Sequence, residues 1–135
     1  MSELSVEARV ENLDEVLQFV NAEVERFDCS PRAQMQLEIA VEELFVNIAN
    51  YAYDTETGVA TVRVETQAEP PAVLVTFIDN GVPYDPLAKE DPDVTKSAED
   101  RQIGGLGIYM VKKSMDDIAY SYKGGQNILT IKKNL

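Results

Sequence analysis

The order in which apolar patterns follow one another along the chain constrains its fold more than any other feature of the sequence. Alternating or continuous apolar residues predict strands over 4–10, 59–65, 73–78, 117–123 and 128–132. Apolar residues at helical spacing predict helices over 13–29 and 30–53, and a third over 108–115 that follows a glycine-rich turn. Helices and strands do not alternate strictly in this order, which disfavours a doubly wound parallel sheet. We therefore expect an α+β fold, a two-layer α/β sandwich in which helices cover one face of a mixed, mostly antiparallel sheet.

Local signals mark where these elements begin and how they are connected. Asn12 is expected to cap the first helix, and Ser30 the second, with Pro31 at the first helical position. The segment 83–102 combines prolines and acidic residues with few apolar ones, so we expect a mobile loop with room for a short helix.

The charge balance and the cysteine content exclude several kinds of partner and location. Acidic residues outnumber basic ones by 24 to 12, for a net charge of −12. This charge opposes binding to nucleic acid and to anionic membranes. No apolar run approaches the ~18 residues that span a bilayer, and the N-terminus lacks the basic start of a signal peptide. A lone cysteine, Cys29, fits a reducing compartment. We expect one cytoplasmic domain over residues 1–135.

The chain contains no histidine, and this absence excludes whole classes of chemistry. Neither a Ser-His-Asp nor a Cys-His nucleophile pair can form, and a phosphohistidine relay within the chain is impossible. Cys29 alone cannot build a zinc site. If the chain is an enzyme, its general base is a carboxylate, a lysine or a tyrosine.

A first candidate for chemistry lies on the second predicted helix. Glu43 and Asn47 are four residues apart and therefore lie side by side, and Asn50 continues the polar row. A carboxylate can accept a proton or orient a hydroxyl, and an amide oxygen can ligate Mg²⁺. Taken alone, the row is better explained as a solvated helix face.

Two further candidates are glycine-containing turns. Asp79 directly follows an apolar strand and precedes Gly81, an arrangement that can bind an exocyclic amine while glycine lets a flat ring approach the backbone. Gly-Gly-Leu-Gly over 104–107 precedes a helix and can present N–H groups to a phosphate. Each has a simpler explanation, a tight turn in the first case and a flexible joint in the second.

The three segments in this order, Glu-x-x-x-Asn, Asp-x-Gly and Gly-Gly-Leu-Gly, resemble the N, G1 and G2 boxes of the GHKL ATPases. That superfamily includes gyrase, the Hsp90 chaperones, histidine kinases and MutL, and the resemblance implies its Bergerat-type fold. The short chain and the stretch 79–86 look most like bacterial anti-sigma factors that are also serine protein kinases. The resemblance extends over nearly the whole chain.

The resemblance also implies roles for individual residues. Glu43 would be the general base for the attacking hydroxyl, Asn47 would ligate Mg²⁺, and Asp79 would hydrogen-bond the adenine amino group of ATP. The other nucleotide-binding positions would be Asn50, Gly81, Gly104, Gly105, Leu106 and Gly107. The segment 86–102 would be a lid over the phosphates.

By this resemblance the chain is an ATP- and Mg²⁺-dependent serine kinase. Its substrate would be an anti-anti-sigma protein of the STAS type, its other partner a sigma factor that it sequesters, and it would form a homodimer. Two alternatives stay open: a non-catalytic ATP-binding regulatory module, and a detached ATPase domain of a histidine kinase or chaperone.

The sequence departs from the family pattern at three places. Pro83 replaces the last glycine of the G1 box, and Tyr51 stands where histidine often follows the N box. Gln126 and Asn127 follow Gly125, where the family often has a threonine that supports the adenine-binding acid, so that second contact stays open.

Overall fold

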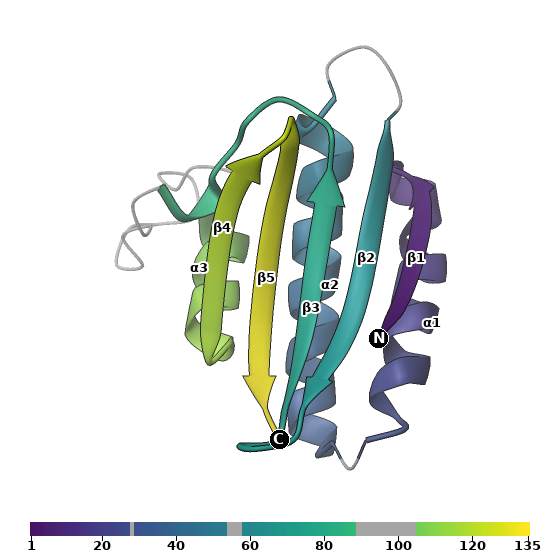
Figure 1. The fold of residues 1–135 in the computed structure, drawn as a ribbon, viewed down its shortest axis with the longest axis vertical. Coiled ribbons are helices and arrows are strands. Elements are labelled where there is room, and N and C mark those ends of the chain that lie inside the picture. Colours follow the sequence, from purple (N-terminus) through teal and green to yellow (C-terminus); the bar gives the residue numbers. More distant parts are fainter. Residues whose placement is uncertain (28, 54–57, 89–104) are drawn as a thin grey trace.

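One antiparallel sheet forms a layer of the protein, and helices form the second layer on one of its faces (Figure 1). The computed structural model describes residues 1–27, 29–53, 58–88 and 105–135. The strands are β1 (Ser2–Glu7), β2 (Val59–Gln67), β3 (Ala72–Asp79), β4 (Asp117–Lys123) and β5 (Gln126–Asn134). The helices are α1 (Leu13–Val24), α2 (Pro31–Tyr51) and α3 (Gly105–Ser114), with short 3₁₀-helices over Val10–Asn12 and Pro86–Ala88.

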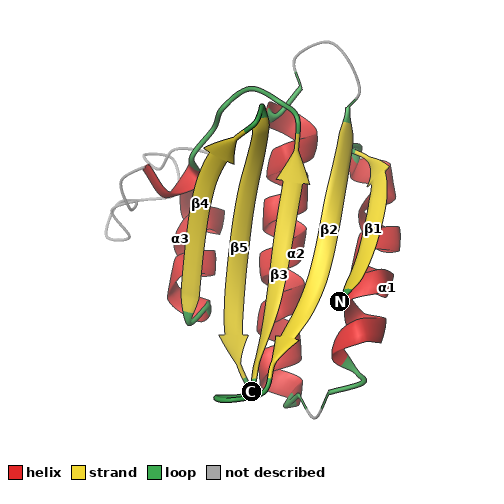
Figure 2. Cartoon of the chain, viewed as in Figure 1, coloured by secondary structure: helices red, strands yellow, loops and turns green. Residues whose placement is uncertain are grey.

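The predicted fold class and element order are confirmed. The strand order is β1-β2-β3-β5-β4, and all four pairings are antiparallel, so the described sheet is purely antiparallel rather than mixed. Figure 2 shows α1, α2 and α3 on the same side of the sheet, with α2 in the middle. None of the helices described is long and apolar enough to cross a membrane.

The core lies between α2 and the inner face of the sheet. Every second residue of β3 is fully buried, as strand geometry requires when one face is covered. The largest buried side chains of the two layers are Leu37, Val41, Leu44, Phe45, Phe77 and Ile131. Burial of each such side chain contributes about 1.5–3 kcal/mol, which fixes α2 against the ends of β3 and β5.

The second helix begins as predicted, whereas the region before the first helix differs. Ser30 Oγ accepts a hydrogen bond from Ala33 N (3.1 Å), so the predicted cap is confirmed. Asn12 occupies the cap position of α1, but its side chain makes no capping bond there. Asn12 Nδ2 donates instead to Glu7 O (2.9 Å), which holds the turn that ends β1.

Three predicted boundaries were wrong. β1 ends at Glu7, and Val10 begins a 3₁₀-helix with 47% of its surface exposed, although its alternation suggested a strand to residue 10. α1 ends at Val24 rather than near residue 29. α2 ends at Tyr51 instead of residue 53. The short helix expected in the loop over 83–102 is the 3₁₀-helix Pro86–Ala88, while 89–104 lie outside the described residues.

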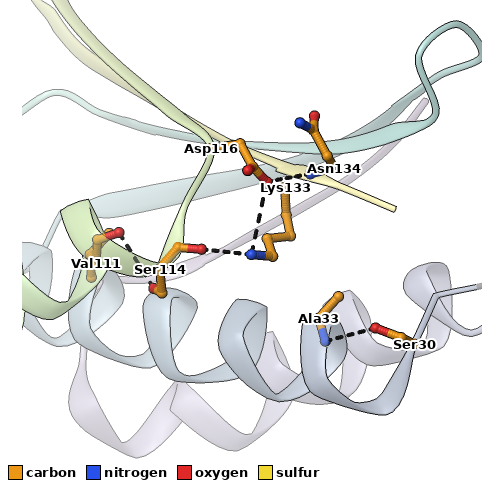
Figure 3. A network of polar contacts seen from close by, with 7 residues as sticks. All are labelled: Ser30, Ala33, Val111, Ser114, Asp116, Lys133 and Asn134. Carbon is orange, nitrogen blue, oxygen red and sulfur yellow. Dashed lines mark hydrogen bonds and ion pairs between the residues drawn. The ribbon is translucent and has the colours of Figure 1, made fainter.

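The C-terminal end of α3 is tied to the sheet by a polar network (Figure 3). Lys133 Nζ donates to Ser114 O (2.8 Å) and lies 3.8 Å from Asp116 Oδ2. A cation at a helix C-terminus is favourable because unsatisfied carbonyl groups give that end a partial negative charge. Asp116 Oδ2 also accepts from Asn134 N (2.7 Å). The network therefore anchors the helix whose other end carries the glycine motif.

Candidate functional site

A pocket opens where the C-terminal half of α2 meets the end of β3 and the start of β5. Its cavity volume is about 40 Å³, and it opens to solvent. It is lined by Leu44, Asn47, Ile48, Ala52, Phe77, Asp79, Tyr84, Pro86, Tyr120, Asn127 and Leu129. Mostly apolar walls with a few polar groups are typical of small-molecule sites, where the polar groups fix the ligand's orientation.

Asp79 lies at the buried end of this pocket with one carboxylate oxygen already bonded. It is the last residue of β3 and only 5% exposed. Oδ1 accepts from Gly81 N (2.9 Å), which forms the tight turn after the strand, and from Asn127 Nδ2 (2.9 Å). No described residue donates to Oδ2. The pocket therefore offers a carboxylate oxygen to a ligand that carries an N–H donor.

Gly81 packs against the end of α2. A Cβ atom at Gly81 would overlap the backbone carbonyl of Ala52, and Val82 N donates to that same carbonyl (2.9 Å). Backbone atoms cannot shift as a flexible side chain can. Glycine is therefore required for the turn after β3 to pack against α2. This requirement holds independently of any space that the glycine leaves for a ligand.

Asn47 presents an unpaired amide on the pocket wall. Among the described residues, its Nδ2 is the one fully buried side-chain nitrogen or oxygen without a hydrogen-bond partner. Leaving such a group unpaired costs about 1–3 kcal/mol, so this position favours a bound partner. Asn47 and Asp79 line the same pocket, as the sequence reasoning anticipated for two groups at one ligand.

Glu43 lies one helical turn before Asn47 and contacts the glycine motif of α3. It is half-buried and is not a lining residue of the pocket. A Cβ at Gly107 would overlap the Glu43 carboxylate, so glycine lets α3 approach Glu43 in its present position. Burial, and to a lesser extent the charge of Glu42, raises the pKa of Glu43 above its ordinary value. A more basic carboxylate is a better proton acceptor.

Comparisons with known proteins show the family and the fold. The sequence profile of a family described as histidine kinase-like ATPase domain matches residues 6–133. The chain belongs to this family. A solved structure, the histidine kinase domain of the blue-light-activated kinase EL346 from Erythrobacter litoralis, superposes with a TM-score of 0.58 at 16% identity. The superposition covers 91% of this chain and 61% of that one, and it establishes the likeness of fold.

Curated relatives of this histidine kinase-like ATPase domain carry kinase names. Serine/threonine-protein kinase BtrW of Bordetella bronchiseptica is 28% identical over 102 residues, 76% of this chain and 71% of BtrW. Serine-protein kinase RsbW of Listeria monocytogenes is 32% identical over 100 residues, 71% of this chain and 63% of RsbW. RsbW of Bacillus cereus is 31% identical over 100 residues, 71% of this chain and 61% of RsbW. The chain thus spans less than two thirds of these RsbW proteins.

The polar groups present in this histidine kinase-like ATPase domain fit ATP and Mg²⁺. Asp79 offers an acceptor for an amine at one end of the pocket. On its wall the buried Nδ2 of Asn47 is a donor without a partner, which suits a phosphate oxygen. The oxygen of the same amide is of the kind that ligates Mg²⁺ alongside substrate phosphates. Gly105 begins α3, where helix N–H groups favour an anion.

Not every predicted site residue is placed in or beside the pocket. Asn50 is exposed and does not line it. Gly105 and Leu106 form the first positions of α3, and Gly104 lies outside the described residues. The structure therefore brings together Asn47 with Asp79, and Glu43 with Gly107, while Asn50 stays apart.

The sequence reasoning missed three polar residues of the pocket, Tyr84, Tyr120 and Asn127. Asn127 was noted only as a departure from the family pattern, yet its side chain bonds Asp79 directly. The pairing of β3 with β5 places Asp79 opposite Asn127. The apolar pattern does not determine this register to the residue, so no sequence signal marked Asn127. Tyr51, the other departure, stacks on Tyr84 at a ring distance of 6.2 Å.

We predict that Glu42→Gln lowers the pKa of Glu43 in the nucleotide-free protein. The substitution removes a neighbouring negative charge, and like charges raise the pKa of a carboxyl group. A carboxyl-carbon NMR titration measures the change. Glu38→Gln, on the same helix and exposed, is the matched control and leaves the pKa unchanged. If Glu42→Gln has no effect, burial alone raises the pKa.

Proposed function

We propose that this histidine kinase-like ATPase domain binds Mg²⁺·ATP in the pocket and transfers the terminal phosphoryl group to a serine of a protein partner. The observation that carries the proposal is the arrangement along α2. Asn47 shares a pocket with Asp79, and Glu43, one turn away, touches the glycine motif at the start of α3. In this proposal, these groups hold opposite ends of one nucleotide.

Each residue has a distinct task in this proposal. Asp79 Oδ2 accepts a hydrogen bond from the adenine amino group, and the apolar walls hold the ring. Asn47 holds Mg²⁺, which neutralises phosphate charge when bound. Glu43 orients the serine hydroxyl and accepts its proton. Phosphoryl transfer depends mostly on positioning and charge neutralisation, so a net charge of −12 leaves the metal and the N-terminus of α3 to supply most of the positive field.

The proposed partners come from the family resemblance. The substrate is an anti-anti-sigma protein of the STAS type, and the same domain sequesters a sigma factor in the cytoplasm as a homodimer. The names of BtrW and RsbW, both protein kinases acting on serine or threonine, support the kinase part of the proposal. Nucleotide-site residues other than those above, Gly81, Gly104, Gly105, Leu106 and Asn50, are assigned by the same resemblance.

The test is phosphotransfer from ATP labelled at its terminal phosphate. The protein is incubated with Mg²⁺ and STAS-type candidate partners, and the label is expected on a serine of one partner. Chelating Mg²⁺ abolishes the transfer. ATP binding with no transfer to any partner would favour the alternative, a non-catalytic ATP-binding regulatory module.

A further inference from the structure

The Asn127 side chain is saturated with hydrogen bonds inside the protein. Nδ2 donates to Asp79 Oδ1 (2.9 Å) and to Val82 O (2.8 Å). Oδ1 accepts from the Tyr120 hydroxyl and from Tyr84 N (3.2 Å). An amide has two N–H donors and two acceptor sites, so all four are used. With 6% of its surface exposed, Asn127 cannot exchange these partners for water.

The partners of Asn127 also fix which way its amide points. Val82 O can only accept, and Tyr84 N can only donate. A reversed amide would place two acceptors face to face at Val82 and two donors face to face at Tyr84. The Tyr120 hydroxyl adds a third constraint, because its single proton goes to Asn127 Oδ1 and its oxygen accepts from Tyr84 N (3.2 Å).

This fixed amide determines what the buried end of the pocket offers a ligand. Asp79 Oδ1 is occupied by two protein donors, Gly81 N and Asn127 Nδ2. Neither donor of Asn127, nor the Tyr120 proton, is left for a ligand. Of the side-chain atoms of Asp79, Asn127 and Tyr120, the one without a partner among the described residues is the acceptor Asp79 Oδ2.

We propose that Tyr120 and Asn127 are specificity-determining residues of the nucleotide site: they hold Asp79 with one outward acceptor, so the pocket selects a purine with an exocyclic amine and rejects one with a carbonyl there. The inference rests on the proposed ATP-binding function. A threonine hydroxyl, which the family pattern often has in support of the acid, can rotate and either donate or accept. The locked amide cannot adapt in this way.

The test compares two ligands that differ at the critical position, ATP and inosine triphosphate, which carries a carbonyl in place of the amine. Dissociation constants are measured by calorimetry with Mg²⁺. The wild type is expected to favour ATP by about 10- to 100-fold, since a hydrogen bond to a charged group contributes about 1.5–3 kcal/mol. Tyr120→Phe removes one of the three constraints on the Asn127 amide and lowers this preference about 3- to 10-fold, a loss of about 1 kcal/mol as for one neutral hydrogen bond.

Control variants distinguish a change in nucleotide specificity from a general loss of binding or stability. Tyr122→Phe, at an exposed tyrosine on the same strand, keeps the wild-type preference. Asn127→Thr lowers the preference while retaining ATP binding. The side-chain amide protons of Asn127 are expected to exchange with solvent slowly in the wild type and faster in Tyr120→Phe. This exchange rate reports how firmly the amide is held, even where nucleotide affinity changes little.

The results that would overturn this inference differ from those that would overturn the proposed function. Equal weakening of both nucleotides in Tyr120→Phe, with the preference unchanged, would make Tyr120 and Asn127 structural supports only and overturn the inference. A wild type that binds ATP and inosine triphosphate equally would also overturn it while leaving nucleotide binding intact. If the wild type binds neither nucleotide, both the inference and the proposed ATP-binding function are overturned.

Discussion

Glu43→Gln lowers the rate of phosphoryl transfer to the partner about 10²- to 10⁴-fold, the range that a positioned general base contributes, and leaves ATP affinity nearly unchanged. Glutamine keeps the size of glutamate and its contact with Gly107, so the site stays assembled. Its amide cannot accept the serine proton. Single-turnover transfer of labelled phosphate, with ATP binding measured separately, checks both halves of the prediction.

Glu42→Gln is the matched control for this substitution. Glu42 is adjacent in sequence but exposed, and no contact links it to the glycine motif of α3 in the described structure. We expect transfer within a few-fold of the wild type. Wild-type transfer by Glu43→Gln would remove Glu43 from the chemistry, and a loss of ATP affinity in that variant would make Glu43 a binding residue instead.

Asp79→Asn weakens ATP binding about 10- to 100-fold, as expected when a charged hydrogen-bond acceptor of about 1.5–3 kcal/mol is lost. The oxygen of the new amide must accept from Gly81 N and Asn127 Nδ2, because both are donors. Its nitrogen then faces the adenine amino group, and two donors oppose each other. Calorimetric titration with Mg²⁺·ATP measures the loss.

The same variant should lose less affinity for inosine triphosphate, whose carbonyl can accept from the new amide nitrogen. Asp85→Asn is the control, since Asp85 is exposed and its oxygen accepts from Leu87 N (2.9 Å), a bond that an amide oxygen can keep. Unaltered ATP affinity in Asp79→Asn would place the adenine ring somewhere other than this pocket.

Elements defined by local signals were predictable from the sequence. Ser30, Pro31 and a long apolar stripe determine where α2 begins and which face it buries. The end of β1 was not predictable, because the alternation of apolar residues continues to Val10 after the strand has turned away. Asn12 failed as a cap since its amide bonds Glu7 O, a contact that depends on how the turn folds.

The same division holds for the candidate site. Glu43 and Asn47 are neighbours on one helix, so the sequence places them together without knowledge of the fold. Asn127 reaches Asp79 across 48 residues, and Tyr84 reaches Tyr120 across 36. Those contacts depend on the register of β3, β5 and β4, which the sequence pattern does not determine to the residue. The base-recognition network was therefore visible only in the structure.

A crystal structure of the protein with Mg²⁺ and a non-hydrolysable ATP analogue tests the central claim most directly. We expect the adenine amino group within hydrogen-bond distance of Asp79 Oδ2, the metal on the Asn47 amide oxygen, and the terminal phosphate beside Glu43 and Gly107. A nucleotide bound elsewhere, or one whose terminal phosphate lies far from Glu43, would contradict it.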